Sequence, residues 1–196
     1  MYISIEHLPE GVLKRYHADL APKGLAEEKF RREVAAYSWF AENDIAYVPK
    51  LISHDVEQLL MLVEHAGVPL NHWIADGNQH LWPDVIRQLS SIDQDLYRRR
   101  VNYLFSSPAD VLVDEDGRVR IIDFEYTEAG CGYEHLLMTA MDNQRLFECD
   151  EVAAESFLIL VRKAIPTSYR YWWRRLRYSV YGRMGLLREQ LIRINE

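Results

Sequence analysis

The stretch DVLVDEDGRVRIID, residues 110–123, decides how this sequence folds. Its Asp-Gly pair, Asp116 and Gly117, stands between two runs of aliphatic residues, which is a strong signal for a β-hairpin. Both runs carry apolar residues at consecutive positions, so we expect both faces of the hairpin to be buried. With the turn at 115–116, position 110 falls opposite position 121 or 122. Asp110 and Asp123 are therefore expected to emerge at the same open end of the hairpin.

Two carboxylates at one end of a hairpin have two interpretations. They can share a hard divalent cation, because magnesium takes one or two carboxylates and completes its shell with phosphate oxygens and water. Alternatively, Asp110 caps the start of one strand and Asp123 is a turn residue at the end of the other. The spacing by itself favours the second interpretation.

The sequence before this hairpin predicts a small antiparallel sheet with one helix. The strands are marked by alternating or continuous apolar residues, the helix by a 3–4 spacing, and the connections by turn clusters. In chain order we expect two strands, the helix and two further strands, over residues 2–7, 12–16, 25–43, 48–53 and 59–63. Gly67-Val68-Pro69 is expected to break the chain after them.

The remaining sequence predicts mostly helices around the hairpin. Pro83 suits the first turn of a helix, and an apolar stripe follows at positions 85, 86, 89, 92 and 96. Further helices are expected over 152–164, ending near Pro166, and over 172–191. The predicted fold class is α+β, with a small antiparallel sheet and one helix followed by a mostly helical part that contains a β-hairpin.

The composition excludes several classes of protein. The 196 residues are 48% hydrophobic and 12% aromatic, which is enough to bury a core and excludes a disordered chain. Cys131 and Cys149 are too few for a disulfide scaffold and lack metal-site spacing, so we expect a reducing compartment. The sequence lacks an apolar run of the roughly 20 residues that a spanning helix needs, and its first residues do not resemble a secretory signal. We therefore expect a cytoplasmic protein.

Charge is distributed unevenly along the chain. Residues 1–161 hold 14 Lys/Arg and 28 Asp/Glu, a net charge of −14, whereas residues 162–196 hold 9 and 2, a net charge of +7. This basic end suits an anionic surface such as lipid headgroups or a glycolipid, which would place the protein at the inner face of a membrane. Alternatively it packs on the acidic body, which is the interpretation that we favour. Nucleic acid is not expected, because the rest of the chain would repel phosphates. The residues that would contact an anionic surface are Arg170, Trp172, Trp173, Arg174, Arg175 and Arg177.

Short motifs follow one another in an order that resembles the protein-kinase-like superfamily. They are Val12-Leu-Lys14, Phe30-Arg-Arg-Glu33, Leu60-Met-Leu-Val-Glu64, Pro108-Ala-Asp110 and Ile121-Ile-Asp123-Phe-Glu125. The resemblance covers about residues 11–126, in the form found in bacterial lipopolysaccharide kinases and in choline or aminoglycoside kinases. It implies a truncated protein-kinase-like bilobal fold, with a reduced N-lobe over 1–66 and a helical C-lobe over 67–196.

The resemblance also implies a role for each matching residue. Lys14 would reach the phosphates of ATP, and Glu33 would pair with Lys14 and hold it in place. Glu64 and Ala66 would belong to a hinge between the lobes, with backbone groups facing adenine. The implied ligands of Mg2+ are Asp123 and, where the family usually has an asparagine, Asp110.

The sequence departs from the family seriously at two places, and more mildly at Glu134-His135-Leu136, where the family usually has Asp-Leu. The window that corresponds to the family's His-x-Asp ends on Phe105, which cannot accept a proton as the catalytic base does. Gly11 is the sole glycine before Lys14, so a phosphate-covering glycine loop cannot be drawn. Asp93 and Asp95, at the end of the helix that precedes this window, are candidates for a substitute base. However, aspartates near the end of a helix are ordinarily surface residues. No catalytic residue is therefore assigned.

Two functions remain open. The first is a kinase-like protein with a degenerate active site, a pseudokinase, which retains nucleotide or Mg2+ binding and acts through partners or at an anionic surface. The second is a reduced ATP-dependent phosphotransferase that acts on a glycolipid, a sugar or another small hydroxyl substrate. Phe105 and the missing glycine loop favour the first, and the four retained polar residues favour the second. We prefer the first.

Overall fold

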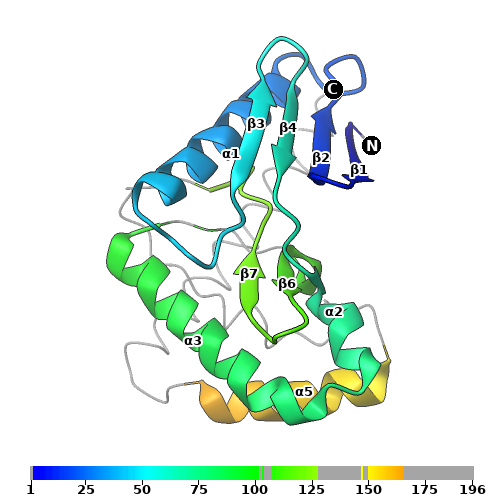
Figure 1. The fold of residues 1–196 in the computed structure, drawn as a ribbon, viewed down its shortest axis with the longest axis vertical. Helices are drawn as coiled ribbons and strands as arrows, with labels where there is room; N and C mark the ends of the chain where they lie inside the picture. Colours follow the sequence, from blue (N-terminus) through cyan, green and yellow to red (C-terminus); the bar gives the residue numbers. More distant parts are fainter. Residues whose placement is uncertain (1, 102, 104–106, 128–146, 148–149, 166–196) are drawn as a thin grey trace, which may run out of the picture.

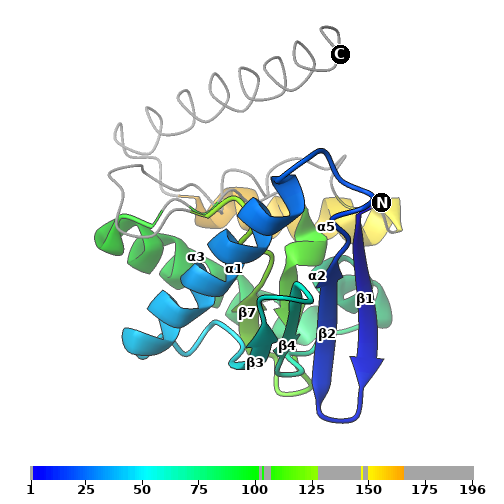
Figure 2. The same ribbon diagram turned by 90° about the horizontal axis from the view of Figure 1, so that it is seen from above.

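The computed structural model describes residues 2–101, 103, 107–127, 147 and 150–165. Its N-terminal part is a four-stranded antiparallel sheet in the order β1-β2-β4-β3. The strands are β1 (Ile3–Leu8), β2 (Gly11–Tyr16), β3 (Leu51–Asp55) and β4 (Leu60–Val63). Helix α1 (Leu25–Glu42) packs against β2 and β3 (Figure 1). Strand β1 is the edge strand on the side away from α1, as Figure 2 shows.

The sequence predicted these elements well because each has a strong local signal. The turn between Leu8 and Gly11 joins β1 and β2 in register, and the apolar face of α1 is buried through residues such as Phe30 and Phe40. Strand β3 is the exception, since it occupies 51–55 rather than 48–53. The reason is Pro49, which has no amide hydrogen to donate to a ladder, so the strand begins only after it.

The second sheet contains the hairpin and one strand that the sequence analysis missed. Strands β6 (Val111–Val113) and β7 (Val119–Ile121) pair antiparallel, with Val111 opposite Ile121 as predicted. Strand β5 (Val68–Pro69) pairs with β6 where a chain break was expected. Gly67 allows this pairing: its φ is 116°, and a Cβ there would lie 2.3 Å from the carbonyl oxygen of Val113.

The expectation that both faces of the hairpin are buried was wrong. Val111, Val113, Val119 and Ile121 are buried, whereas the residues between them, Leu112 and Arg120, are only half-buried. The buried face packs on the core of the helical part, and the half-buried face carries a charged side chain, that of Arg120. The apolar runs in the sequence therefore overstated how deeply this sheet is enclosed.

Helices form the rest of the described structure. They are α2 (Leu70–Trp73), the short 3-10 turns Ile74–Asp76, Gln79–Leu81 and Pro108–Asp110, α3 (Trp82–Arg99) and α5 (Glu151–Ala164). Pro83 lies in the first turn of α3 as predicted, and the whole stripe from Val85 to Leu96 is buried. Figure 1 shows α5 crossing the end of α3 where that helix begins, and Trp82 and Phe157 pack edge-to-face where the two helices meet. The helix expected over 172–191 lies outside the described residues.

One aromatic side chain joins the two parts into a single core. Phe124 follows β7, and its ring lies 5.0 Å from that of Tyr37 and 4.8 Å from that of Phe40, both on α1. The Phe124 ring also lies 5.4 Å from the ring of Tyr103, which follows α3 in the helical part of the chain. The chain is thus α+β, as predicted, with two small antiparallel sheets. Among the described residues, no helix is both long and apolar enough to cross a bilayer.

Candidate functional site

The centre of the candidate site is Lys14, in the middle of β2. Its Nζ atom lies 2.8 Å from Oε2 of Glu33 on α1 and 2.8 Å from Oδ1 of Asp123, which follows β7. The three side chains are 13%, 2% and 29% exposed, respectively. The structure therefore brings together three of the predicted site residues from three separate elements, with Asp123 on the side nearest to solvent.

Glu33 is held by donors from three directions. Besides the ammonium of Lys14, its carboxylate accepts a hydrogen bond from the Tyr16 hydroxyl and one from the backbone amide of Phe124, at 3.3 Å. Burial raises the pKa of Glu33, and Lys14 opposes that rise. Burial and the neighbouring Glu33 carboxylate also raise the pKa of Tyr16, so Tyr16 stays a hydroxyl donor.

Lys14 stays an ammonium group. Burial lowers its pKa, but the two carboxylates of Glu33 and Asp123 more than offset burial, so the pKa lies above the ordinary value of a lysine. The site therefore contains one fixed positive charge between two acidic side chains. Such a charge can bind phosphate oxygens as well as carboxylates.

Asp123 reaches Lys14 because the chain turns sharply after β7. Its φ is 66°, in the left-handed region, which non-glycine residues rarely adopt. The residue before it is fixed on both sides: the amide of Ile122 donates to the carbonyl of Asp110 at 2.9 Å, and the Tyr103 hydroxyl donates to the carbonyl of Ile122 at 2.8 Å. Aspartate is one of the few residues that tolerates this conformation.

Asp110 has a structural role, although it belongs to the capping box of a 3-10 turn rather than capping the start of a strand as the alternative interpretation had it. Its Oδ2 accepts from the amide of Ser107 at 2.8 Å, and the Ser107 hydroxyl accepts from the amide of Ala109, which forms a capping box at the 3-10 turn. Its backbone lies beside Ile122, so the predicted proximity of the two hairpin ends holds. Part of the Asp110 carboxylate is nevertheless used as a cap.

A preformed metal centre is not part of the described structure. Within its residues, no group of three or more His, Cys, Asp or Glu side chains could hold a metal ion. The half-exposed carboxylate of Asp123 still fits Mg2+, because that ion is usually bound through one or two carboxylates together with phosphate oxygens.

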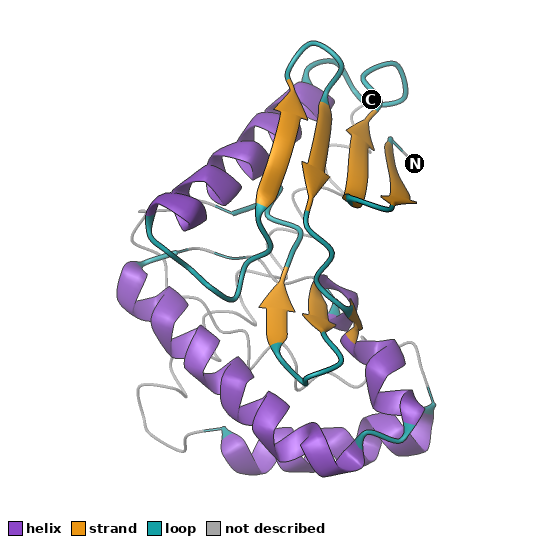
Figure 3. Ribbon diagram, viewed as in Figure 1, coloured by secondary structure: helices purple, strands orange, loops and turns teal. Residues whose placement is uncertain are grey.

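The hinge predicted at Glu64 and Ala66 lies where the chain passes from the first sheet to the second (Figure 3). Oε2 of Glu64 accepts from Nη1 of Arg120 at 3.1 Å and from the amide of Lys50 at 3.2 Å. The amide of Glu64 donates to the carbonyl of Lys50, and Ala66 is buried. The Glu64 side chain therefore ties the two sheets together.

Several residues near the site were missed or misjudged. Asp93 is only 2% exposed, although an aspartate at this place was expected on the surface. Asp95 accepts from the Tyr47 hydroxyl at 2.9 Å, which links α3 to the segment before β3. A buried ion pair between Lys29 and Glu125 was not anticipated at all.

Two groups of predicted residues lie outside the described part of the chain. These are Phe105 and the basic aromatic residues of 166–196. Searches of family models and of curated proteins find no match to this chain. The function must therefore be argued from the geometry of Lys14, Glu33 and Asp123.

Proposed function

We propose that this chain is a kinase-like protein with a degenerate active site, which binds ATP with Mg2+ and acts through partners. One observation carries the proposal: the ammonium of Lys14 lies 2.8 Å from both Glu33 and Asp123. In protein kinases a strand lysine pairs with a helix glutamate, and a metal-binding aspartate follows the hairpin of the other lobe. The same three residue types meet here from the corresponding kinds of element.

The arrangement of the elements supports a truncated bilobal fold. In the described residues, an antiparallel sheet with one helix, within 2–66, lies above a mostly helical part, within 67–101, 107–127 and 150–165, that contains the hairpin leading to Asp123 (Figure 1). The segment from Glu64 to Gly67 joins the two. The phosphates would approach from the side of Asp123, the most exposed of the three side chains.

In the proposed complex, nucleotide binding would exchange the partners of Lys14 at this site. Lys14 would contact phosphate oxygens, Glu33 would keep it oriented, and Asp123 would bind the Mg2+ that accompanies the phosphates. Asp110, which lies beside Ile122, would supply a further oxygen if its capping bond to Ser107 were shared. The metal would neutralise phosphate charge, and the chain would hold both in one orientation.

Two features favour a binding protein over an efficient enzyme. Phe105 occupies the position of the base, and general-base catalysis typically contributes about 10²–10⁴ in rate. Tyr103 replaces the histidine of the same motif, and burial raises the pKa of its hydroxyl, which donates to the carbonyl of Ile122. The β1–β2 turn, with Gly11 as its sole glycine, does not provide a glycine-rich loop to cover phosphates.

The alternative function is a slow ATP-dependent phosphotransferase. The assembled Lys14, Glu33 and Asp123 favour it, because phosphoryl transfer depends mostly on positioning and charge stabilisation. Its acceptor would be a glycolipid, a sugar or another small hydroxyl compound. A cytoplasmic protein bound at the inner face of a membrane, through the basic residues 170–177, would meet a glycolipid acceptor there.

A thermal-shift titration with ATP, with and without Mg2+, tests nucleotide binding. At 100 times the dissociation constant, a ligand adds roughly 2.7 kcal/mol of stability. We expect a magnesium-dependent shift in the native protein that is lost in Asp123→Asn, since asparagine tolerates the left-handed conformation but lacks the charge. Asp116→Asn, in the exposed hairpin turn, is the matched control and should keep the shift.

The result that contradicts the proposal is the absence of any shift at millimolar ATP, or a shift that Asp123→Asn leaves unchanged. Transfer of radiolabelled phosphate to a panel of glycolipid and sugar acceptors then separates the two functions. Transfer that is abolished in Asp123→Asn supports the enzyme. Binding without transfer supports the pseudokinase.

A further inference from the structure

A second buried ion pair joins α1 to the segment that carries Asp123. Nζ of Lys29 lies 2.9 Å from Oε1 of Glu125, and both side chains are 8% exposed. Lys29 also donates to the hydroxyl of Tyr126. Buried lysines and glutamates are rare unless they are paired, so this contact is a specific feature of the fold rather than a surface ion pair.

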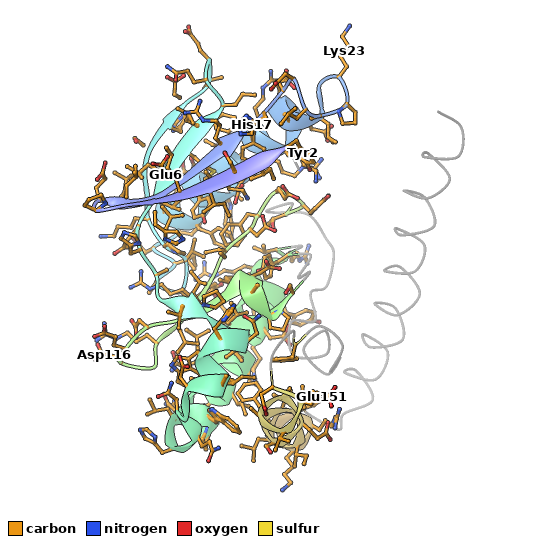
Figure 4. The ribbon with its side chains drawn as sticks, turned by 90° about the vertical axis from the view of Figure 1, so that its right-hand side faces the viewer. Tyr2, Glu6, His17, Lys23, Asp116 and Glu151 are labelled. Carbon is orange, nitrogen blue, oxygen red and sulfur yellow. The ribbon has the colours of Figure 1, made fainter. Side chains whose placement is uncertain are left out.

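Aromatic rings enclose the ammonium of Lys29. It lies 3.8 Å from the centroid of the Tyr126 ring and 5.3 Å from that of Tyr2. Figure 4 shows Tyr2 at the same end of the first hairpin as His17, far from Asp116 at the tip of the second hairpin. The start of β1, the first turns of α1 and the segment after Asp123 therefore meet around one charge.

Glu125 depends on this lysine. Its second carboxylate oxygen, Oε2, is buried and has no hydrogen-bond partner in the part of the chain that the structure describes. A buried carboxylate with one strong partner is held in place only while that partner remains. Without Lys29, Glu125 would gain by turning toward water, and it would carry its neighbours in the chain with it.

The ion pair lies one helical turn from the candidate site. Lys29 precedes Glu33 by four residues, so both project from the same face of α1. Glu125 follows Asp123 by two residues. Helix α1 therefore contacts the segment 123–125 at two points. Glu33 accepts a hydrogen bond from the amide of Phe124, and Lys29 donates to Glu125.

We propose that Lys29 and Glu125 form a positioning pair that holds Asp123 against Lys14, so that binding of ATP with Mg2+ depends on an ion pair that does not touch the nucleotide. The inference rests on the proposed function for its ligand. The left-handed conformation of Asp123 favours such a device, because a sparsely populated backbone conformation is held by the contacts on both sides of it. Glu125 anchors the chain immediately beyond it.

Hydrogen exchange tests the positioning pair without any ligand. In Lys29→Met we expect the Phe124 amide, which is bonded to Glu33, to exchange about tenfold faster or more, relative to the Val119 amide in the same protein. The amide of Val119, in the hairpin, donates to the side chain of Gln88 on α3 and reports general loosening of the helical part. Lys29→Arg should restore the protection of Phe124. Arg31→Met removes an exposed charge from the same helix and should change neither amide.

Nucleotide affinity supplies the second measurement. Lys29→Met should weaken binding of ATP with Mg2+ by about tenfold and binding of ATP alone much less, because the pair acts through Asp123. In an Asp123→Asn background, Lys29→Met should have no further effect. If Lys29→Met does not fold, Glu125→Gln gives the same comparison, since it removes the charge and keeps the shape of the side chain.

The outcomes separate this inference from the proposed function. Unchanged Phe124 protection in Lys29→Met and Glu125→Gln overturns the positioning pair, whatever the protein binds. Selective loss of Phe124 protection in a protein that gives no shift with ATP supports the pair and contradicts nucleotide binding. Equal weakening of ATP binding with and without Mg2+, together with faster exchange at Val119, shows a merely structural role and also overturns the inference.

Discussion

Replacing Lys14 with methionine removes the positive charge at the centre of the site and keeps most of the side-chain volume. Among the described residues, the Glu33 carboxylate, 2% exposed, then retains the Tyr16 hydroxyl and the Phe124 amide as its donors. Removing one partner of a buried ion pair costs about 3–5 kcal/mol of unfolding free energy, because the remaining charge is buried without compensation. We expect Lys14→Met to lie near the lower end of this range at pH 7.5, since two donors remain.

The pH dependence of this cost reveals its origin. Burial already raises the pKa of Glu33, and loss of Lys14 removes the charge that opposes this rise. A carboxyl whose pKa is higher in the folded than in the unfolded state loses stability as the pH rises through the folded value. The deficit of Lys14→Met should therefore shrink as the pH falls from 7.5 to 5.5, by at most about 1.4 kcal/mol per pH unit.

Urea unfolding followed by circular dichroism measures both quantities. Glu33→Gln is the matched comparison, because it leaves Lys14 paired with Asp123 and should cost only about 1–2 kcal/mol. The double variant Lys14→Met/Glu33→Gln should be more stable at pH 7.5 than Lys14→Met alone. A cost below about 1 kcal/mol for Lys14→Met, or a cost independent of pH, would refute the view that Glu33 is a buried charge held by Lys14.

Three further predictions concern the fold. Burial raises the pKa of Tyr16, Tyr37 and Tyr103, so above about pH 10 the unfolded chain should release these protons before the folded chain does, and the free energy of unfolding should fall by about 4 kcal/mol per pH unit. Tyrosine absorbance at 295 nm and circular dichroism should then change together. Normal ionisation of all tyrosines in a protein that stays native would contradict this prediction. Gly67→Ala should lower the free energy of unfolding, measured by thermal melting, by about 3 kcal/mol or more, because the added Cβ would meet the Val113 carbonyl. Gly77→Ala, at a φ of 77° with open space around it, should lower it by about 1 kcal/mol. Equal costs for the two variants would exclude the close approach to Val113 as the cause. Leu89→Ala, at a position on α3 with 0% exposure, should lower the free energy of unfolding in urea by about 3–5 kcal/mol. The control Gln94→Ala, at an exposed position of the same helix, should lower it by less than about 0.5 kcal/mol. A small effect at Leu89 would mean that the buried face of α3 does not form the core of the helical part.

Local patterns predicted most of the elements, because their signals lie within a few residues. The Asp116-Gly117 turn fixed the register of β6 and β7, and the apolar stripe of α3 fixed its buried face. Strand β5 could not be predicted in this way. It has two residues, and it exists only because β6 lies beside it and Gly67 lets the two backbones approach.

The candidate site was predicted in part. The proximity of Lys14, Glu33 and Asp123 was expected from the resemblance to kinases, and the geometry confirms that the three side chains meet. The pair of Lys29 and Glu125 was not expected, because the two residues are 96 positions apart and each looks like an ordinary charged residue in the sequence. Partners in a long-range ion pair are set by the tertiary fold and leave little trace in local composition.

The position of Phe124 has a consequence for attempts to divide this protein. Its ring packs simultaneously against Tyr37 and Phe40 above and Tyr103 below. A fragment that ends near residue 66 would therefore present the aromatic underside of α1 to water, and the complementary fragment would present Phe124. Neither piece should stay soluble by itself, whereas the two expressed together should reassemble. The chain passes from one sheet to the other near residue 66, but this point does not separate two independent domains. The molecule should therefore melt as one cooperative unit.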